Sequence, residues 1–330
     1  MRDRLGAKPL NATDDPLEAA AQRLQAGELV AFPTETVYGL GARADDDRAV
    51  ARIFVAKGRP ADHPLIVHVA CVAAAELFAA SLSPAARRLM AGFWPGPLTI
   101  IVPRRAGMAT AAAAGQDSVG LRLPQHPMAL ALLQRAAELG VAGVAGPSAN
   151  RFGRVSPTTA DHVRQEFGPD LMVLDGGACA VGIESAIVDC TRAQPALLRP
   201  GQLSREQLAQ VLGQPLAAPD ATSPRAPGTL ASHYAPSVPL RLWTSGDLAA
   251  RLRQPPQPGE VVAVYSRMTP AAELGWRHQP MATHSAQVAH DLFSVLRDLD
   301  QLGVTAIWVE HPPPDAHWDG VRDRLQRAAA

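Results

Sequence analysis

The chain of 330 residues has few cysteines, no excess of charge of either sign and no long apolar run. Its three cysteines, Cys71, Cys179 and Cys190, share no spacing typical of a metal site, and such a sparse, odd set favours a reducing compartment. No apolar run reaches about 18 residues, which a membrane-spanning helix needs. The first residues, MRDRLGAKPLNATDD, lack the apolar core of an export signal. We therefore expect a cytoplasmic protein with no membrane partner.

The charge balance also limits the possible partners. Lys plus Arg and Asp plus Glu both number 31, so the formal net charge is zero. A broad nucleic-acid platform needs many excess cations on one face, so we expect no strong direct binding of nucleic acid. A local basic cleft remains compatible with this balance. With 47% hydrophobic and 19% charged residues, the chain is expected to fold, and its length allows two domains.

The pattern of apolar and capping residues predicts a first α/β domain over residues 1–213 with a twisted mixed sheet. Asp45, Asp46 and Asp47 precede one helix and are expected to cap it. Ser83 and Ser204 are expected to cap two further helices. Strands are predicted over residues 29–33, 64–70, 98–103, 118–124, 141–150, 172–177, 184–191 and 195–201, and helices over 16–26, 49–59, 83–94, 127–140, 158–168 and 204–213.

Residues 214–239 are rich in Pro, Ala and Ser and show no periodicity, which is typical of a linker. A structureless stretch of this length is more often functional or mobile than idle. The pattern restarts over residues 240–330, with strands predicted at 240–243, 260–266 and 304–310 and helices at 285–303 and 318–329. Strands that alternate with helices predict a small, Rossmann-like parallel domain.

Residues 32–68 gather polar side chains where predicted strands meet loops, as the sites of α/β folds do. Lys57 and Arg59 lie two residues apart, and a point charge beside a planar guanidinium suits a polyanion. The string from Gly39 to Ala44 mimics the dinucleotide fingerprint G-x-G-x-x-A, but it opens no predicted helix, so we expect no nicotinamide or flavin site. No P-loop sequence occurs in the chain.

Other polar residues are ambiguous one at a time. His63 and His68 are five residues apart around a strand, which argues against joint ligation of a metal. His68 alone is interpreted equally well as a hydrogen-bonded residue at a strand end or as a contact to substrate. The segment Gly146–Asn150 fits an ordinary turn as well as it fits a binding loop. Taken together, four cations and four polar side chains near strand ends favour an anion-handling, nucleotide-using enzyme. These residues are Lys57, Arg59, Arg122, Arg199, Ser118, Ser148, Asn150 and Ser156.

The ordered motifs PTETVYGLG, KGRP, HPLIVH, GPSAN, SPT, G-x-E-S-x-IVD and LRPG resemble those of the threonylcarbamoyl-AMP synthases of the YrdC-like group. The restart after SPRAPGTLASHYAP is similar to the long form, which has an extra C-terminal domain. The resemblance implies a nucleotidyltransferase that makes threonylcarbamoyl-AMP and pyrophosphate from ATP, L-threonine and bicarbonate or CO2. Its product would supply the machinery that transfers threonylcarbamoyl to tRNA.

The same resemblance implies roles for individual residues. Lys57 and Arg59 would be the catalytic cations, and Mg2+ would enter with the ATP phosphates rather than through an assigned protein ligand. L-Threonine would contact Thr36, His68, Arg122, Gly146 and Ser185. ATP would contact Arg59, His63, Ser118, Ser148, Asn150, Ser156, Arg199 and Tyr234, with Tyr234 part of a lid that the linker forms and that excludes water.

Two residues depart from the family pattern: His63 stands where Asn is usual, and Ala186 where Thr is usual. We expect activity to survive both, because neither belongs to the cation set. Two other functions stay open at this point. One is a non-catalytic RNA-binding module that uses the same basic cleft, and the other is a carbamoyl-transfer domain that works on carbamoyl phosphate. Dependence on threonine separates both from the synthase.

Overall fold

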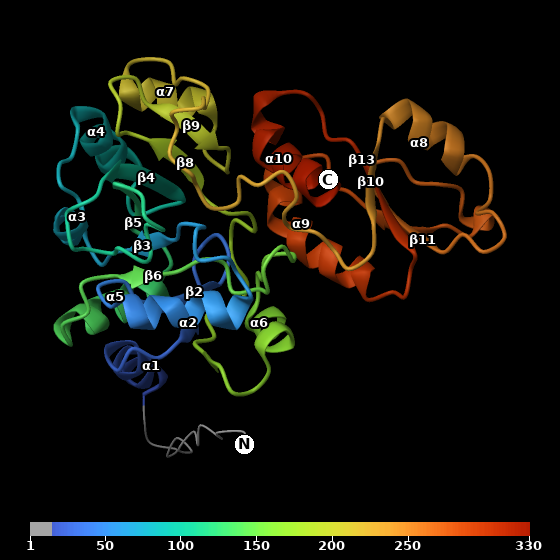
Figure 1. Ribbon diagram of the computed structural model, residues 1–330. Helices are drawn as coiled ribbons and strands as arrows, with labels where there is room; N and C mark the ends of the chain where they lie inside the picture. The colour runs from blue at the N-terminus through green and yellow to red at the C-terminus, as the bar shows by residue number, and fades with distance from the viewer. Residues whose placement is uncertain (1–14) are drawn as a thin grey trace.

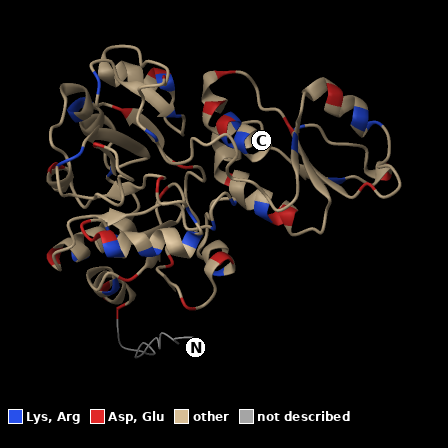
Figure 2. Ribbon diagram, viewed as in Figure 1, with Lys and Arg blue, Asp and Glu red and all other residues tan. Residues whose placement is uncertain are grey.

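The computed structural model describes residues 15–330 as two α/β domains joined by an irregular linker (Figure 1). Residues 1–14 lie outside the described residues. The expectations about an export signal and about the start of the first domain concern those residues and therefore also lie outside the described part. No helix in the described part is long and apolar enough to cross a membrane. Basic and acidic residues are interspersed along the helices of both domains (Figure 2).

The first domain is built on a nine-stranded mixed sheet with the order β7-β1-β2-β6-β3-β5-β4-β8-β9. This confirms the predicted mixed-sheet α/β fold. Its strands are β1 Val30–Phe32, β2 Gly39–Arg43, β3 Ile66–His68, β4 Leu98–Pro103, β5 Ser118–Arg122, β6 Val144–Ala145, β7 Met172–Val173, β8 Ala186–Asp189 and β9 Ala196–Arg199. Its helices are α1 Pro16–Gln25, α2 Asp47–Lys57, α3 Val72–Phe78, α4 Pro84–Phe93, α5 Pro127–Glu138, α6 Ala160–Phe167 and α7 Arg205–Leu212.

Strand β2 carries Gly39 and Gly41 of the fingerprint-like string and lies outside the predicted strands. It pairs with β1 so that Gly41 lies opposite Val30 and Gly39 opposite Phe32. A Cβ atom at Gly41 would lie 2.9 Å from Phe32 Cε1 and 2.9 Å from Val144 Cγ1. The glycines therefore leave space for the Phe32 ring beside the strand. The strand has no β-branched residue, which is why the sequence pattern did not predict it.

Helix α2 shows how the local sequence sets the fold. Asp46 is the N-cap, and its carboxylate accepts hydrogen bonds from Arg48 N at 2.8 Å and Ala49 N at 3.4 Å. Of the other two acids expected to cap this helix, Asp45 instead accepts from the Arg43 guanidinium and Asp47 from Ala111 N. The helix ends at Gly58, whose φ of 62° permits the left-handed cap and turns the chain toward Arg59.

The second domain has a four-stranded parallel sheet with the order β10-β13-β11-β12, which confirms the predicted parallel fold. Its strands are β10 Leu240–Trp243, β11 Val262–Ser266, β12 Arg277–Pro280 and β13 Ala306–Glu310. Helices α9 Ser285–Asp300 and α10 Asp319–Ala328 lie between this sheet and the first domain, and α8 Ser245–Leu252 lies on the far side (Figure 1). Two short 3-10 turns, Ala272–Leu274 and Ala316–Trp318, complete the domain.

Candidate functional site

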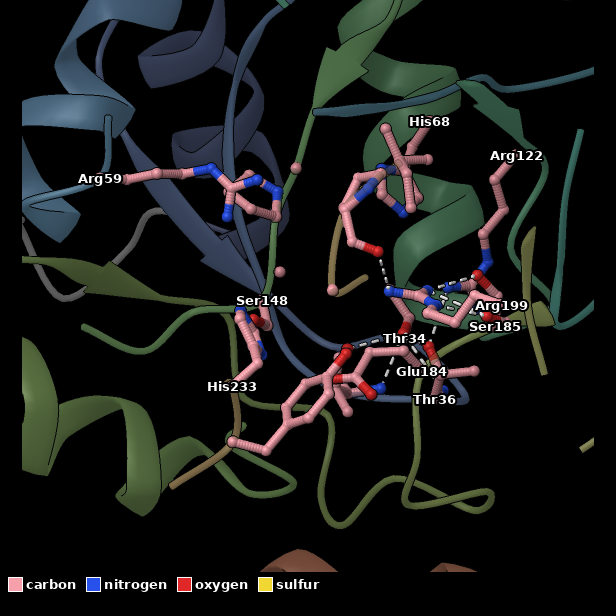
Figure 3. A pocket seen from close by; sticks show the side chains of 18 residues that line it. Thr34, Thr36, Arg59, His68, Arg122, Ser148, Glu184, Ser185, Arg199 and His233 are labelled. Atoms are coloured by element: carbon pink, nitrogen blue, oxygen red, sulfur yellow. Dashed lines mark hydrogen bonds between the residues drawn. The ribbon is translucent and has the colours of Figure 1, made fainter. Parts of the chain in front are cut away.

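A cavity lies where β1, β3, β5, β6 and β9 end, where β8 begins and where the linker crosses them (Figure 3). It holds about 520 Å³ of space not filled by atoms, part of it open to solvent. The linker supplies four of the lining residues, so the stretch predicted to form a lid does reach this cavity. The lining residues are Thr34, Thr36, Val37, Gly39, Arg59, Ile66, His68, Arg122, Gly146, Pro147, Ser148, Glu184, Ser185, Arg199, Pro227, Gly228, His233 and Tyr234.

Arg122 anchors a relay of hydroxyl groups at one end of the cavity. Its Nη1 donates to Thr36 Oγ1 at 2.8 Å, and its Nη2 lies 2.7 Å from Glu35 Oε1. Thr34 Oγ1 donates to the Val37 carbonyl at 2.6 Å, so in the 2.8 Å pair of threonine hydroxyls Thr36 must be the donor. Arg122 Nε is buried with no hydrogen-bond partner among residues 15–330, so the guanidinium retains capacity for an anion.

His68 lies beside Arg122, because strands β3 and β5 are parallel and pair these two residues in register. Burial and the nearby Arg122 charge lower the pKa of His68 to about 3, so the ring is neutral at pH 7. Its Nδ1 has no hydrogen-bond partner in the described part of the chain. Gly146 lies against the ring: a Cβ atom there would be 3.1 Å from His68 Nδ1 and 3.2 Å from Phe32 Cζ. The site therefore contains a neutral imidazole with an unused nitrogen.

Arg59 faces the cavity, whereas Lys57 lies behind it. Arg59 donates from Nη2 to the Pro64 carbonyl at 3.0 Å, and its buried Nε has no partner within residues 15–330. Burial lowers the pKa of Arg59 to about 10, which leaves it charged at pH 7. Lys57 Nζ donates to Ser148 O at 2.6 Å and to Asn150 O. Burial, and next the charge of Arg59, hold the pKa of Lys57 well below its usual value.

The loop that Lys57 supports carries Ser148 and Asn150. Ser148 lines the cavity, but Asn150 Nδ2 turns away and donates to Arg151 O at 2.7 Å and Arg154 O at 2.9 Å. Asn150 Oδ1 is buried with no partner in the described chain. Lys57 and the amide of Asn150 thus fix the loop, and one amide oxygen is left available.

Glu184 is the one acidic side chain that lines the cavity among the described residues. Burial alone would raise its pKa, but the charges of Arg324 and Arg199 and the hydroxyl of Ser156 lower it below its ordinary value. Ser156 Oγ donates to Glu184 Oε1 at 2.5 Å. An ionised carboxylate can only accept, so Ser156 offers only lone pairs to any ligand.

Arg199 joins the cavity wall to the linker. Its Nε and Nη2 donate to Ser185 O at 3.1 and 2.9 Å, and its Nη1 donates to Pro227 O at 2.9 Å. The Ser185 hydroxyl, which is fully buried, lies 2.8 Å from Thr99 Oγ1. Figure 3 shows Arg199 and Ser185 close together on the wall of the cavity, opposite Arg59. Arg199 therefore holds both the wall and the linker that covers it.

The linker closes over the cavity at Gly228, His233 and Tyr234. Tyr234 is buried in a left-handed conformation with φ of 63°, which is uncommon for a residue with a side chain and marks local strain. A Cβ atom at Gly228 would lie 2.2 Å from Tyr234 Oη and 2.8 Å from Arg199 Nη1. Burial raises the pKa of Tyr234 to about 12 and lowers that of His233 to about 3. Both rings are therefore neutral at pH 7.

Among the residues predicted from the sequence, nine line this cavity: Thr36, Arg59, His68, Arg122, Gly146, Ser148, Ser185, Arg199 and Tyr234. Lys57, Asn150 and Ser156 lie behind its wall, as described above. Ser118 lines a neighbouring cavity of about 290 Å³, which shares Pro227 with the first. His63 lies outside both cavities and packs its ring edge-on against Phe152, with the ring centres 5.3 Å apart.

Sequence reasoning missed Glu184, Thr34 and His233. Glu184 lies within the motif G-x-E-S-x-IVD, and His233 precedes Tyr234 in HYAP, so both lay within quoted motifs. The partners of Glu184 and of the His233 backbone, Arg324 and Arg327, come from a distant segment that only the fold reveals. Thr34, in contrast, bonds locally to Thr36 and Val37 and lies in the quoted motif PTETVYGLG.

Comparisons with known proteins match both parts of the chain to one kind of protein. Residues 22–201 match the family Sua5/YciO/YrdC, described as "Telomere recombination", and residues 203–330 match the "Threonylcarbamoyl-AMP synthase, C-terminal domain". A threonylcarbamoyl-AMP synthase from Pyrococcus abyssi is 37% identical over 95% of this chain and 94% of its own, and one from Bacillus subtilis is 37% identical over 97% and 94%. The crystal structure of Pyrococcus abyssi Sua5 complexed with L-threonine superposes with a TM-score of 0.85 at 35% identity, covering 95% of this chain and 94% of that one.

Proposed function

This chain belongs to the Sua5/YciO/YrdC family, and we propose that it is a threonylcarbamoyl-AMP synthase that uses ATP, L-threonine and bicarbonate or CO2. The observation that carries the proposal is the cavity itself. Three buried arginines, Arg59, Arg122 and Arg199, and a neutral His68 line it, and the linker covers it. Such a site suits two anionic substrates that must react away from water.

We assign the end of the cavity around Arg122 to L-threonine. The carboxylate of the amino acid would accept from the guanidinium, whose Nε is unpaired. His68 can reach the same molecule with an unused ring nitrogen, and Gly146 leaves space beside it. Thr36 has already committed its proton to Thr34, so it would serve the substrate as an acceptor.

We assign the triphosphate of ATP to the space between Arg59, Ser148 and Arg199, which line the cavity from different sides. These side chains approach from the segment after α2, the turn after β6, and β9. Fixed cations need no reorganisation when charge moves between phosphate oxygens, which is the main source of catalysis in phosphoryl and nucleotidyl transfer. Lys57 contributes by holding the loop of Ser148 in place.

The reaction needs two steps. The neutral amine of threonine attacks CO2, or bicarbonate with loss of water, and gives up a proton to solvent to form a carbamate. A carbamate oxygen then attacks the α-phosphorus of ATP, and pyrophosphate leaves. Neither step uses a covalent bond to the protein, so the chain acts by orientation, charge neutralisation and exclusion of water. The closed linker supports this proposal, because a carbamate hydrolyses readily when water reaches it.

Magnesium is proposed to arrive with ATP. Among residues 15–330 no group of three or more His, Cys, Asp or Glu could hold a metal ion. The unpaired Asn150 Oδ1 and the hydroxyl of Ser148 are oxygen donors of the kind Mg2+ accepts when phosphates supply most of its ligands. The ion would neutralise phosphate charge as pyrophosphate departs.

We further propose that the product is handed to the machinery that modifies tRNA and that the reaction takes place in the cytoplasm. Threonylcarbamoyl-AMP is a mixed anhydride of a carbamate and a phosphate, so an acyl-transfer enzyme must consume it. The buried setting of Cys179 and Cys190, neither of which forms a disulfide, is compatible with a reducing compartment.

The direct test is product formation. Purified protein is incubated with ATP, Mg2+, L-threonine and labelled bicarbonate, and the label is followed into an adenylate by mass spectrometry. The proposal expects labelled threonylcarbamoyl-AMP only when all components are present. If ATP and carbamoyl phosphate, without threonine or bicarbonate, yield carbamoyl-AMP with release of pyrophosphate and inorganic phosphate, the chain is a carbamoyl-transfer domain. If no adenylate forms, an RNA-binding module becomes the better account.

A further inference from the structure

The last helix of the second domain reaches the wall of the cavity through Arg324. This side chain is 1% exposed although its helix, α10, belongs to the second domain. Arg324 Nε donates to Glu184 Oε2 at 2.9 Å, Nη2 donates to Glu184 O at 3.0 Å, and Nη1 donates to Pro200 O at 2.8 Å. All three acceptors lie in the first domain, on segments that flank the cavity.

The backbone of α10 approaches the first domain closely enough to explain this reach. A Cβ atom at Gly320 would lie 2.7 Å from Gly201 O and 2.8 Å from Ile183 Cδ1. Only a residue without a side chain lets the helix come so near, and Gly320 lies one turn before Arg324. The contact is therefore a close-packed interface between the two domains that depends on the glycine at this position.

The same helix holds the linker. His233 N donates to Arg327 O at 3.0 Å, and Arg327 Nη1 donates to Leu230 O. The Arg324 guanidinium also lies over the Tyr234 ring, 5.4 Å from its centre. Helix α10 thus contacts both the fixed wall of the cavity and the segment that covers it.

We propose that Arg324 is a positioning residue for the catalytic site, which acts through Glu184 and makes the first domain's cavity dependent on the second domain. This rests on the proposed synthase function. Arg324 holds Glu184 by both its side chain and its carbonyl, while Arg199 holds the next residue, Ser185, from the other side. The two arginines fix the peptide of residues 184–185 at the cavity wall.

Arg324 also fixes the direction of the Ser156 hydroxyl. While Glu184 is ionised, Ser156 must donate to it and offers lone pairs elsewhere. A protonated Glu184 could donate instead and would reverse that hydroxyl. Because Glu184 is buried, loss of the Arg324 charge would favour the protonated form. A variant without this charge should therefore lose activity most strongly at acidic pH.

The groups that face Glu184 come from four elements: Arg324 of α10, Arg199 of β9, Lys57 of α2, and His233 and Tyr234 of the linker. The pKa of His233, about 3, and that of Tyr234, about 12, lie outside the range from pH 5.5 to 8.5. Lys57 and Arg199 are common to every variant below. A loss of activity at acidic pH that appears only in the variant without the Arg324 charge therefore reports on the protonation of Glu184.

The test compares Arg324→Gln with the matched control Arg322→Gln in the full-length protein. Arg322 lies in the same helix, but within residues 15–330 it bonds only to Pro313, Asp315 and Asp319 of the second domain. Threonine-dependent pyrophosphate release is measured from pH 5.5 to 8.5. We expect Arg324→Gln to lose about 10- to 100-fold at pH 6.5 and to recover partly toward pH 8.5. Arg322→Gln should retain the wild-type profile, and Arg324→Lys, which keeps the charge but not the three guanidinium hydrogen bonds, should be slower without the new loss of activity at acidic pH.

A double-mutant cycle keeps the proposal testable even if Arg324→Gln alone does not fold, because it also removes the buried carboxylate that would be left unpaired. If Arg324 acts through Glu184, then Glu184→Gln/Arg324→Gln should be no slower than Glu184→Gln and should show no new loss of activity at acidic pH. Additive losses, or an Arg324→Gln profile that matches Arg322→Gln, would overturn the proposal. A wild type that shows no threonine-dependent release would refute the synthase function itself, which is a separate result.

Discussion

At the scale of single residues, the site is defined by which charges are left without partners. Arg59 and Arg122 each donate from one guanidinium nitrogen to a protein acceptor, and the buried Nε of each has no partner in the part of the chain that the structure describes. Unpaired buried donors are rare in folded proteins and costly, so they mark places where a ligand completes the structure. His68 presents the same feature without a charge. We infer that anions bind to the arginines while the imidazole supplies a neutral contact.

Replacement of Gly146 by Ala tests the threonine end of the cavity. The added Cβ would press on His68 Nδ1 at 3.1 Å and Phe32 Cζ at 3.2 Å, so the imidazole must move by a few tenths of an ångström. We expect KM for L-threonine to rise by about tenfold, equivalent to about 1.4 kcal/mol, with a smaller change in KM for ATP. The control is Gly246→Ala, where a Cβ meets nothing within 4 Å. Equal KM values for the two variants would argue against His68 as a threonine contact.

Motifs in the sequence located most of the residues on the cavity wall but could not orient them. The tripeptide KGR placed Lys57 and Arg59 together, yet α2 ends at the left-handed Gly58 between them. Arg59 lines the cavity, whereas Lys57 donates to the backbone of the Ser148 loop and does not line it. Ser118 begins β5 and faces the neighbouring cavity, while Arg122 ends the same strand in the main one. The positions of residues along the chain do not reveal which cavity each side chain faces.

At the scale of elements, the linker is the part of the site that depends most on a single conformation. It contains no helix or strand over residues 214–239. Three hydrogen bonds hold it in place. Its Pro227 carbonyl accepts from Arg199, its His233 N donates to Arg327 O, and its Ser237 N donates to Asp300 Oδ1 at 2.8 Å. Because it lines both cavities at Pro227, we expect it to move aside when ATP enters and to close again before the chemistry.

Gly228→Ala should prevent this closure. The new Cβ would overlap Tyr234 Oη at 2.2 Å and Arg199 Nη1 at 2.8 Å. We expect kcat to fall by at least about tenfold, since water would reach the carbamate. The matched control is Gly259→Ala, which shares the positive φ, 82° against 69°, but whose Cβ would meet nothing within 4 Å. A steady-state comparison in which both variants retain the same kcat would show that linker closure does not limit the reaction.

The sequence predicted those elements whose ends carry capping signals. Ser83, Ser204 and Asp46 begin helices, and each side chain accepts a backbone N–H there. Helix α8 carried a similar signal in Thr244, which accepts from Asp247 N at 3.1 Å, and it was overlooked. Strand β12, with the sequence RHQP, has no strand-forming pattern, and it forms because β11 offers it a parallel partner.

At the scale of the whole molecule, the two domains share one polar junction. Arg297 of α9 pairs with Glu166 at 2.8 Å, Thr158 and Ser294 share a hydroxyl contact of 2.9 Å, and Arg324 reaches Glu184. Partners some 130 to 140 residues apart in sequence cannot be matched from local patterns. The predicted boundaries at 213 and 239 remain predictions, although α7, which ends at Leu212, packs on α4 of the first domain.

Buried histidines should make the fold sensitive to acid. Burial lowers the pKa of His68 and His233 to about 3 and of His162 to about 4, against about 6.5 in the unfolded chain. Between these values the unfolded state binds more protons, so the free energy of unfolding falls as pH falls. The two buried rings, His68 and His233, give a slope of up to about 3 kcal/mol per pH unit near pH 5, and the partly exposed His162 adds less. Urea unfolding at pH 5 and pH 7.5 measures it, and equal stabilities at both would contradict the burial of neutral rings.

The central claim, a synthase whose buried arginines handle ATP and threonine together, is tested most directly by pyrophosphate release. The rate is measured with ATP, Mg2+ and bicarbonate, with and without L-threonine, for the wild type and for Arg59→Ala. We predict release by the wild type that depends on threonine and falls by at least about 100-fold in Arg59→Ala, since a fixed cation at the phosphates is lost. Wild-type release that ignores threonine, or the absence of release, would contradict the account.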